Sequence, residues 1–143
     1  MPMMDGYRFV MQRDVEFRDV DVAEHVNNAV YLTYLETARV RYLIDVLGPD
    51  FAYELSLILA HISVDFRSPA RFPEALEIGA CVTRVGNKSF DMQHEIRSSD
   101  GRLVLEASSV LVAYDYEANA PMAVPEDWRA RLDAYEERSS VAT

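Results

Sequence analysis

The sequence predicts an α+β fold in which one long helix packs on an antiparallel sheet. Apolar and aromatic side chains recur at helical spacing at Tyr31, Tyr34, Leu35, Ala38 and Tyr42. Segments with a period of two follow between residues 58 and 116, and short turns join most of them. A long helix with an apolar face needs a broad apolar partner, and such a sheet supplies one.

Length and composition indicate one domain. The chain has 143 residues, of which 50% are hydrophobic, and this is enough material for one substantial core. It contains no internal repeat, linker or low-complexity segment. We therefore expect residues 1–143 to form a single domain, with residues 1–6 and 139–143 flexible.

The charge balance argues against several classes of partner. Fourteen Lys and Arg residues against 24 Asp and Glu residues give a formal net charge of −10, which repels nucleic acid and anionic membranes. The single cysteine, Cys81, cannot form an internal disulfide and fits a reducing compartment. No apolar run approaches the roughly 20 residues that span a bilayer, and residues 1–12 lack the apolar core of a signal peptide. We expect a soluble, cytoplasmic protein with no membrane partner.

The helical part of the chain has clear predicted ends. Residues 7–20 alternate loosely and predict a strand, with Val15 and Phe17 on its buried side. Residues 19–28, which we call the hinge segment, are rich in acidic and amide side chains. Asn27 or Asn28 is suited to cap the long helix that follows, because an amide oxygen can accept from a free N–H of the first turn. The helix should run to residue 46 or 47 and stop at Gly48 and the proline after it.

The predicted sheet comes from four segments with alternating apolar side chains: residues 58–66, 76–83, 90–97 and 103–116. Turns at Gly86-Asn87 and Asp100-Gly101 join the last three as hairpins. Residues 110–113 are apolar on both faces, so their strand should be central. In the segment 58–66, the even-numbered residues carry the apolar face. We expect a loop over residues 115–125 and a short helix over residues 126–137.

The stretch D-V-D-V-A-E-H-V-N-N-A-V-Y-L-T-Y-L-E, which begins at Asp19, resembles the signature of the 4-hydroxybenzoyl-CoA thioesterase type of acyl-CoA thioesterase. The resemblance continues through V-D-F-R-S-P-A-R-F-P-E, V-G-N-K-S-F and V-L-V-A-Y-D, and covers roughly residues 8–128. It implies a hotdog fold, with a sheet of about five strands wrapped around one long helix and a short C-terminal helix. The sequence departs from the family pattern at Glu24, where glycine is common, and at Pro73-Glu74, where Gly-Asp is common.

The resemblance implies hydrolysis of acyl-CoA to a free acid and coenzyme A, with no cofactor. This chemistry needs a nucleophile or general base and fixed donors for the oxyanion. Asp21 resembles the catalytic carboxylate, either as nucleophile or as general base. The backbone N–H near Asn28, at the helix start, is our candidate for polarising the thioester carbonyl. His25 is either a second acid–base group or a residue that holds the loop, and we expect Asp19 to be structural.

Substrate-binding residues are also predicted. A basic set at strand ends suits phosphate binding, unless it is only solvated surface; it consists of Arg67, Arg71 and Lys88, with Arg84 as a further candidate and Ser89 beside Lys88. The resemblance implies that the phosphates are those of coenzyme A. Tyr31 should belong to the core and line the acyl site as well. One cysteine and three scattered histidines do not form a zinc pattern, so we predict no metal.

Other functions fit the same fold. One is a non-catalytic module that binds acyl thioesters, another is a thioesterase for acyl carrier protein, and a third is a hydratase or dehydratase. Asp21 in its motif favours hydrolysis over binding alone, and the sequence has no clear Asp-His or Glu-His motif of the hydratase type. A curved sheet with a helix on one face leaves an open edge, so we expect a homodimer or a homotetramer.

Overall fold

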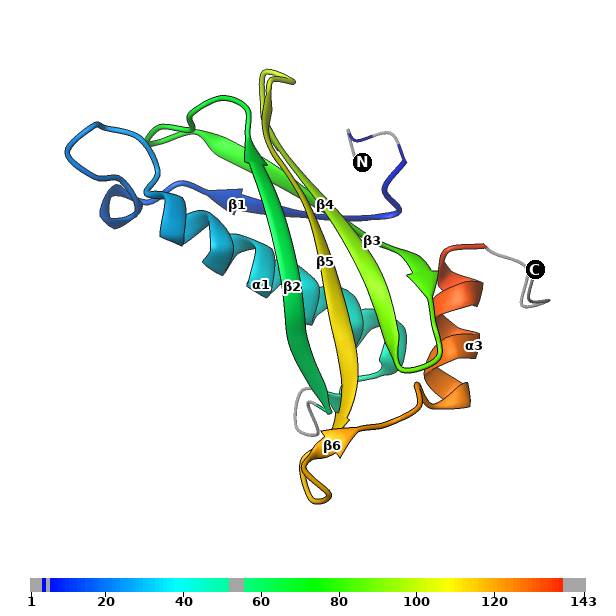
Figure 1. Cartoon of the computed structure of the whole chain (residues 1–143). Coiled ribbons are helices and arrows are strands. Elements are labelled where there is room, and N and C mark those ends of the chain that lie inside the picture. The colour runs from blue at the N-terminus through cyan, green and yellow to red at the C-terminus, as the bar shows by residue number, and fades with distance from the viewer. Residues whose placement is uncertain (1–3, 5, 52–55, 138–143) are drawn as a thin grey trace.

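The computed structural model describes residue 4, residues 6–51 and residues 56–137, and its elements follow the predicted order (Figure 1). The helices are α1 (Asn28–Leu47) and α3 (Glu126–Tyr135), and a 3-10 turn spans Phe17–Asp19. The strands are β1 (Phe9–Asp14), β2 (Leu57–Phe66), β3 (Ala75–Val85), β4 (Ser89–Ser98), β5 (Leu103–Asp115) and β6 (Ala120–Pro121).

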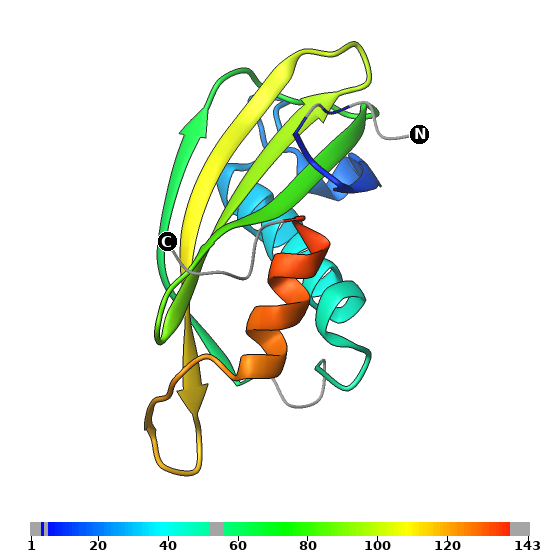
Figure 2. The same ribbon diagram turned by 90° about the vertical axis from the view of Figure 1, so that its right-hand side faces the viewer.

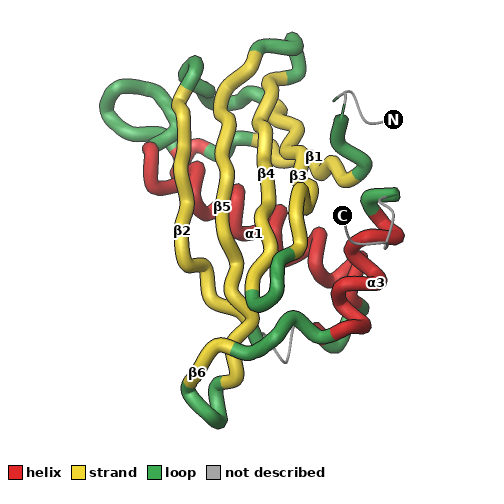
Figure 3. The backbone as a smooth tube through the Cα atoms, turned by 45° about the vertical axis from the view of Figure 1, so that its right-hand side comes forward, coloured by secondary structure: helices red, strands yellow, loops and turns green. Residues whose placement is uncertain are grey.

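The strands form one antiparallel sheet around α1. Their order is β1-β3-β4-β5-β2, and the short β6 pairs with β5. The sheet curves around α1, and α3 packs beside α1 near the β3–β4 turn (Figure 2). The edge strand β2 lies at one side of the sheet and β1 at the other (Figure 3). The predicted α+β hotdog fold is confirmed.

The core lies between α1 and the inner face of the sheet. Leu35, Ala38 and Tyr42 on α1 are fully buried, as are alternate residues of β3 such as Leu76 and Ile78. The helical period brings the first set to one face, and the period of two brings the second set to the facing side of the sheet. The long helix is therefore fixed along its length, and its first turn is held at one end of the sheet.

Both ends of α1 follow the prediction. The side chain of Asn27 accepts a 2.8 Å hydrogen bond from the backbone N–H of Ala29, so Asn27 is the N-cap. At the other end Gly48 has φ = +107° and donates its N–H to the carbonyl of Ile44 at 2.9 Å. Glycine adopts this backbone conformation without the clash that a Cβ would cause.

The prediction of one strand over residues 7–20 is wrong. β1 ends at Asp14, and the 3-10 turn follows. Val15 is 2% exposed, as expected, but Phe17 is 77% exposed and packs edge-on against Phe72. The chain turns because the carboxylate of Asp19 accepts the N–H of Glu16 at 2.9 Å, which a strand ladder would have used.

The predicted faces of β2 are correct only in its second half. The register with β5 shifts between Leu59 and His61, so a bulge lies there. Before the bulge Leu59 is paired with the buried Leu111 and therefore shares its inward face. After the bulge Ile62 is paired with the buried Ser109. An extra residue reverses the alternation, so the even-numbered residues point inward only from residue 62 onward.

Two smaller expectations are corrected. β5 is an interior strand, but β4 occupies the middle of the sheet order. The expected loop over residues 115–125 contains β6. The flexibility of residues 1–6 stays a prediction. Met4, one of the two described residues in that range, is 6% exposed and lies with Tyr7 over Gly79, where a Cβ would meet both side chains within 3 Å. Residues 139–143 lie outside the described residues.

Candidate active site

A cleft of about 250 Å³ lies between the first turn of α1 and the segment that follows β2. We call it the active-site cleft. Residues from the hinge segment, from the first turn of α1 and from the end of β2 form its wall: His25, Val26, Asn28, Tyr31, Phe66, Arg67, Ser68 and Pro69. It therefore contains four of the predicted site residues, namely His25, Asn28, Tyr31 and Arg67.

The hinge segment is held by its own backbone. The N–H of Asp21 donates to the carbonyl of His25 at 3.0 Å, and the N–H of Glu24 donates to the carbonyl of Asp21 at 2.9 Å. This tight turn requires a positive φ at Glu24, which is +66°. Glutamate thus adopts the backbone conformation that glycine occupies readily in the family pattern, at a cost of about 1 kcal/mol.

Asp19 is a buried structural residue. Its side chain accepts hydrogen bonds from the hydroxyl of Tyr34 and from the backbone of Glu16, and its own carbonyl accepts the N–H of Asn27. Burial alone would raise the pKa of Asp19, but these side-chain hydrogen bonds lower the pKa below its usual range. Asp19 therefore connects the hinge segment to α1 as a carboxylate.

Asp21 lies in the tight turn of the hinge segment, between residues 21 and 25, and its side chain is exposed. Its Oδ1 accepts the N–H of Ala23 at 2.9 Å. Within the described part of the chain, no second donor reaches this carboxylate. Asp21 does not line the active-site cleft itself; it lies in the turn that His25 closes. Its carboxylate is open to water or to a bound ligand.

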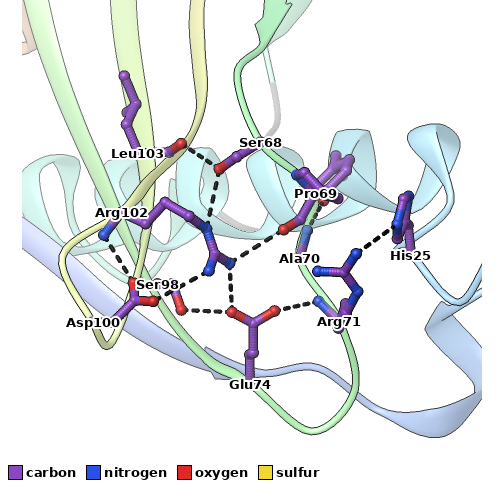
Figure 4. A network of polar contacts seen from close by, with 11 residues as sticks. His25, Ser68, Pro69, Ala70, Arg71, Glu74, Ser98, Asp100, Arg102 and Leu103 are labelled. Atoms are coloured by element: carbon purple, nitrogen blue, oxygen red, sulfur yellow. Dashed lines mark hydrogen bonds and ion pairs between the residues drawn. The ribbon is translucent and has the colours of Figure 1, made fainter.

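His25 contacts Arg71 across the mouth of the active-site cleft. The two side chains approach to 3.2 Å between Nε2 of His25 and a terminal nitrogen of Arg71 (Figure 4). A guanidinium only donates hydrogen bonds, so Nε2 must accept, and the ring proton of neutral His25 then sits on Nδ1. Arg71 thereby fixes the tautomer and the orientation of His25.

A polar network fixes the segment that carries Arg71. The carboxylate of Glu74 accepts from the backbone N–H of Arg71, from the Ser98 hydroxyl at 2.8 Å and from the Arg102 guanidinium (Figure 4). Arg102 also donates to Ser68 Oγ and to the carbonyl of Pro69, each at 3.2 Å. The segment is therefore attached to the β4–β5 turn. Glu74, which departs from the family pattern, is the centre of this attachment.

The first turn of α1 has one free backbone donor. The N–H of Ala29 is used by the side chain of Asn27, and those of Val30 and Tyr31 donate to the Asn27 carbonyl at 2.9 and 3.4 Å. For the N–H of Asn28, the described residues offer no acceptor. This donor lies at the positive end of a 20-residue helix, and Asn28 is one of the residues that line the active-site cleft. Such a position stabilises an oxyanion or another anionic group.

Tyr31 belongs both to the core and to the cleft, as expected. It is 3% exposed, and its hydroxyl accepts the N–H of Ala70 at 3.0 Å. Burial raises its pKa, so the phenol is neutral near pH 7. Its ring lies 5.8 Å from that of Phe66, between centroids. Tyr31 thus holds the two walls of the cleft together.

The structure divides the predicted basic set. Arg67 lines the active-site cleft and pairs with Glu106 at 3.0 Å, and Arg71 contacts His25 nearby. Lys88 and Ser89 lie at the other end of the sheet, because the ten-residue β4 begins at Ser89 and ends near the Arg67 side. At about 3.3 Å per residue, that separation is roughly 30 Å. Within one chain, the set cannot form a single phosphate site.

Several site residues were not predicted. Phe66, Ser68 and Pro69 line the cleft, and the segment that resembles the family, residues 64–74, contains all three. The roles of Glu74 and Arg102 depend on contacts between distant segments and carry no local signal. Among the described residues, no group of three or more His, Cys, Asp or Glu side chains is arranged to hold a metal ion. No described helix is long and apolar enough to cross a bilayer.

Comparisons with known proteins show the family to which the chain belongs. Residues 15–132 match the sequence profile of the thioesterase-like superfamily. The long-chain acyl-CoA thioesterase FadM of Escherichia coli is 28% identical over 128 residues, which cover 86% of this chain and 97% of FadM. Both values indicate that the similarity extends over nearly the whole length of each protein.

Solved structures show the same similarity. A thioesterase from Thermus thermophilus, crystallised in complex with coenzyme A and zinc, is 33% identical with a TM-score of 0.87, covering 95% of this chain and 99% of its own. YbaW of Escherichia coli, a probable thioesterase, is 26% identical with a TM-score of 0.73; the match covers 87% of this chain and 96% of YbaW.

Proposed function

The chain belongs to the thioesterase-like superfamily and is a thioester hydrolase, and we propose that its substrate is an acyl-coenzyme A thioester. The single observation that carries the proposal is that Asn28, whose N–H has no acceptor among the described residues, lines the active-site cleft beside the turn that contains Asp21. The named activity of FadM and the coenzyme A bound to the Thermus thioesterase support the choice of substrate.

In the proposed reaction the thioester carbonyl lies at the start of α1. The carboxylate of Asp21 either takes a proton from a water molecule, whose oxygen attacks the carbonyl carbon, or attacks that carbon itself. Both routes place negative charge on the carbonyl oxygen, and the N–H of Asn28 with the helix dipole stabilises it. Collapse of the intermediate breaks the carbon–sulfur bond, and the thiolate leaves and takes up a proton. The first route gives the free acid directly. The second route leaves an anhydride between Asp21 and the acyl group, and a water molecule then hydrolyses it to the free acid and the Asp21 carboxylate. The open carboxylate of Asp21 supports this role.

His25 has a supporting role in this proposal. Its Nε2 accepts from Arg71, and its carbonyl closes the turn that presents Asp21. These contacts favour a residue that holds the loop over a second acid–base group. Arg71 is then a positioning residue for His25 as well as a candidate phosphate ligand.

A panel of thioesters, with release of the free thiol as the signal, tests the substrate class. We expect turnover of acyl-coenzyme A substrates by the purified protein. Hydrolysis of acyl carrier protein thioesters alone would overturn the proposal in favour of the alternative substrate. Binding of acyl-coenzyme A without turnover of any thioester would instead favour a non-catalytic binding module.

We further propose that the active form is a homodimer formed through β2. This ten-residue strand ends the sheet order, so one side of its backbone has no partner strand among the described residues. Such an edge can pair with a strand of a second chain. Antiparallel pairing of two β2 strands sets the Phe66 end of one copy beside the Leu57 end of the other. The turn with Lys88 and Ser89 in one copy then comes to the end of the sheet that carries Arg67 and Arg71 in the other.

In this arrangement, Arg67 and Arg71 of one copy and Lys88 of the other could contact the same coenzyme A molecule, because the turn that contains Lys88 would lie beside the active-site cleft of the other copy. Light scattering measures the assembly directly. We expect twice the chain mass of 16.3 kDa or a multiple of it. A 16.3 kDa species with full activity would remove the dimer from the proposal.

A further inference from the structure

Three buried polar side chains in the core have atoms without a partner. Arg39 on α1 is 7% exposed, His94 on β4 is 0% exposed, and Ser109 on β5 is 1% exposed. Nε of Arg39, both ring nitrogens of His94 and Oγ of Ser109 form no hydrogen bond with any described residue. Burying polar groups without partners is costly. Their presence in an otherwise apolar core therefore requires an explanation.

Two of these side chains are neighbours on the sheet, and Arg39 lies within electrostatic range of one of them, His94. His94 is paired with Ala107 and Ser109 with Met92, so His94 and Ser109 are diagonal neighbours on the inner face of the sheet. Burial, together with the nearby charge of Arg39, lowers the pKa of His94 to about 3. The imidazole is therefore neutral, with one donor and one acceptor nitrogen. We call these three residues the buried polar cluster.

A second cleft, of about 450 Å³, reaches this cluster. It lies between the middle of α1 and the beginning of β2, and we call it the distal cleft. Arg39 lies on its wall, and Leu43, Leu57, Leu59 and Leu111 are among the apolar residues around it. Leu111 shares the inner face of β5 with Ser109, two residues away. The apolar floor of the distal cleft is therefore continuous with the buried polar cluster.

The distal cleft and the active-site cleft lie along the same border between α1 and β2. Asn28 and Phe66 line the active-site cleft, whereas Arg39 and Leu59 line the distal cleft. About eleven residues of helix separate Asn28 from Arg39, a rise of about 16 Å. An acyl chain whose thioester carbonyl lies at Asn28 would thus extend toward Arg39 along this border.

Glu36 does not satisfy the charge of Arg39. Burial lowers the pKa of Arg39, and the charge of Glu36 opposes this shift only in part. No ion pair within 4.0 Å joins Arg39 to any residue that the structure describes, whereas eight such pairs occur at other sites among them. A guanidinium donates hydrogen bonds and needs an acceptor. A plain hydrocarbon chain in the distal cleft would leave it without one.

We propose that the distal cleft binds an acyl chain that carries an oxygen function, such as a hydroxyl, oxo or carboxylate group, and that Arg39 donates hydrogen bonds to this oxygen. The inference rests on the thioesterase function proposed above. The apolar walls suit the hydrocarbon part of the chain, and the buried cation suits an oxygen within it. A carboxylate is the strongest ligand, because a guanidinium can bind it with two parallel hydrogen bonds.

The test compares kcat/KM for matched acyl-coenzyme A substrates of equal chain length, with and without a terminal hydroxyl or carboxyl group, over a series of chain lengths. At one chain length, we expect the wild-type protein to prefer the oxygenated substrate by at least about tenfold, because a site built to hydrogen-bond a group rejects the analogue that lacks it. Arg39→Met should lose this preference. Arg41→Met, at an exposed position on the same helix, is the matched control and should keep it.

Binding of free acids separates this inference from the proposed function. Calorimetry should show tighter binding of a dicarboxylic acid than of the monocarboxylic acid of equal length, and Arg39→Met should abolish the difference. If no thioester is hydrolysed, the proposed function is wrong, but acid binding still decides the role of Arg39. Equal kcat/KM and equal acid binding in the wild-type protein at every length overturn the inference and leave the thioesterase intact. Should Arg39→Met fail to fold, these wild-type comparisons remain decisive.

Discussion

The hydroxyl of Tyr34 donates a 2.6 Å hydrogen bond to Oδ2 of Asp19, and this oxygen also accepts the N–H of Glu16. The bond joins the start of the hinge segment to the buried face of α1. It gives the two aspartates of the Asp-x-Asp motif different roles. Asp19 is a buried anchor, whereas Asp21 is exposed in the turn that follows.

Replacing Asp21 tests the proposed carboxylate. Asp21→Asn keeps the size of the side chain and its hydrogen bond to Ala23, but it removes the charge and the basicity. We expect kcat to fall by about 10²–10⁴, the usual effect of losing a general acid or base, while the melting temperature stays nearly unchanged because the side chain is exposed. Near-normal kcat in a folded Asp21→Asn protein would rule out the mechanism.

Asp19→Asn is the matched variant and should lower stability more than turnover. It weakens one buried and one partly buried hydrogen bond, which we expect to cost about 1–3 kcal/mol in the free energy of unfolding. Because the pKa of Asp19 is lowered in the folded state, its contribution is fully present above its unfolded pKa, about 3.9, and is lost as the pH falls through the folded value. In denaturant titrations, the free energy of unfolding of Asp19→Asn should therefore be lower than that of the wild-type protein at pH 7, and the two values should converge in strong acid. A constant difference at all pH values would contradict this.

The sequence was most informative where one local signal determines the structure. Asn27 and Gly48 mark the ends of α1, because capping and left-handed backbone depend on nearby residues alone. Most strands follow from their alternation for the same reason. The long helix, the hairpins and therefore the fold were predictable.

Other features depend on contacts between distant segments and could not be predicted. A single-residue bulge at Leu59 and His61 reverses the faces of β2, and alternation alone does not mark it. The separation of Lys88 from Arg67 follows from strand direction across the whole sheet. The burial of Arg39 did have a signal in the sequence. Arg39 follows Tyr31 and Leu35 at steps of four residues on the buried face of the helix, where a charged side chain is unusual.

The free N–H of Asn28 can be removed without breaking the helix. Asn28 is the first residue of α1, a position that tolerates proline, and Asn27 already has the extended backbone (φ −63°, ψ 139°) that a residue before proline requires. We expect Asn28→Pro to fold and to lose about 10²–10³ in kcat, the usual effect of losing one oxyanion donor. Asn28→Ala keeps the N–H and should retain most of the activity. Equal rates for the two folded variants would exclude this donor from catalysis.

The proposed role of Arg67 and Lys88 leads to a prediction about the thiol part of the substrate. If Arg67 and Lys88 bind the nucleotide end of coenzyme A, the double variant Arg67→Ala and Lys88→Ala should raise KM for acyl-coenzyme A and leave kcat largely unchanged. A pantetheine ester lacks the nucleotide, so its kinetics should not change. The measured quantity is the ratio of kcat/KM for the two substrates. An unchanged ratio would mean that both side chains are only surface charge.

The buried guanidinium of Arg39 leads to a prediction of increased stability on mutation. Replacing a buried ion pair with apolar side chains of similar volume is often neutral or stabilising, by about 1–4 kcal/mol, and a buried charge without a partner has the same desolvation cost without the attraction that offsets it. Arg39 is 7% exposed and has no ion-pair partner in the described structure. Arg39→Met should therefore raise the free energy of unfolding, whereas the exposed Arg41→Met should change it by less than about 0.5 kcal/mol. Chemical denaturation of the ligand-free proteins measures both. A loss of stability in Arg39→Met would mean that the guanidinium is already satisfied within the protein, and the oxygen-binding role of the distal cleft would lose its physical basis.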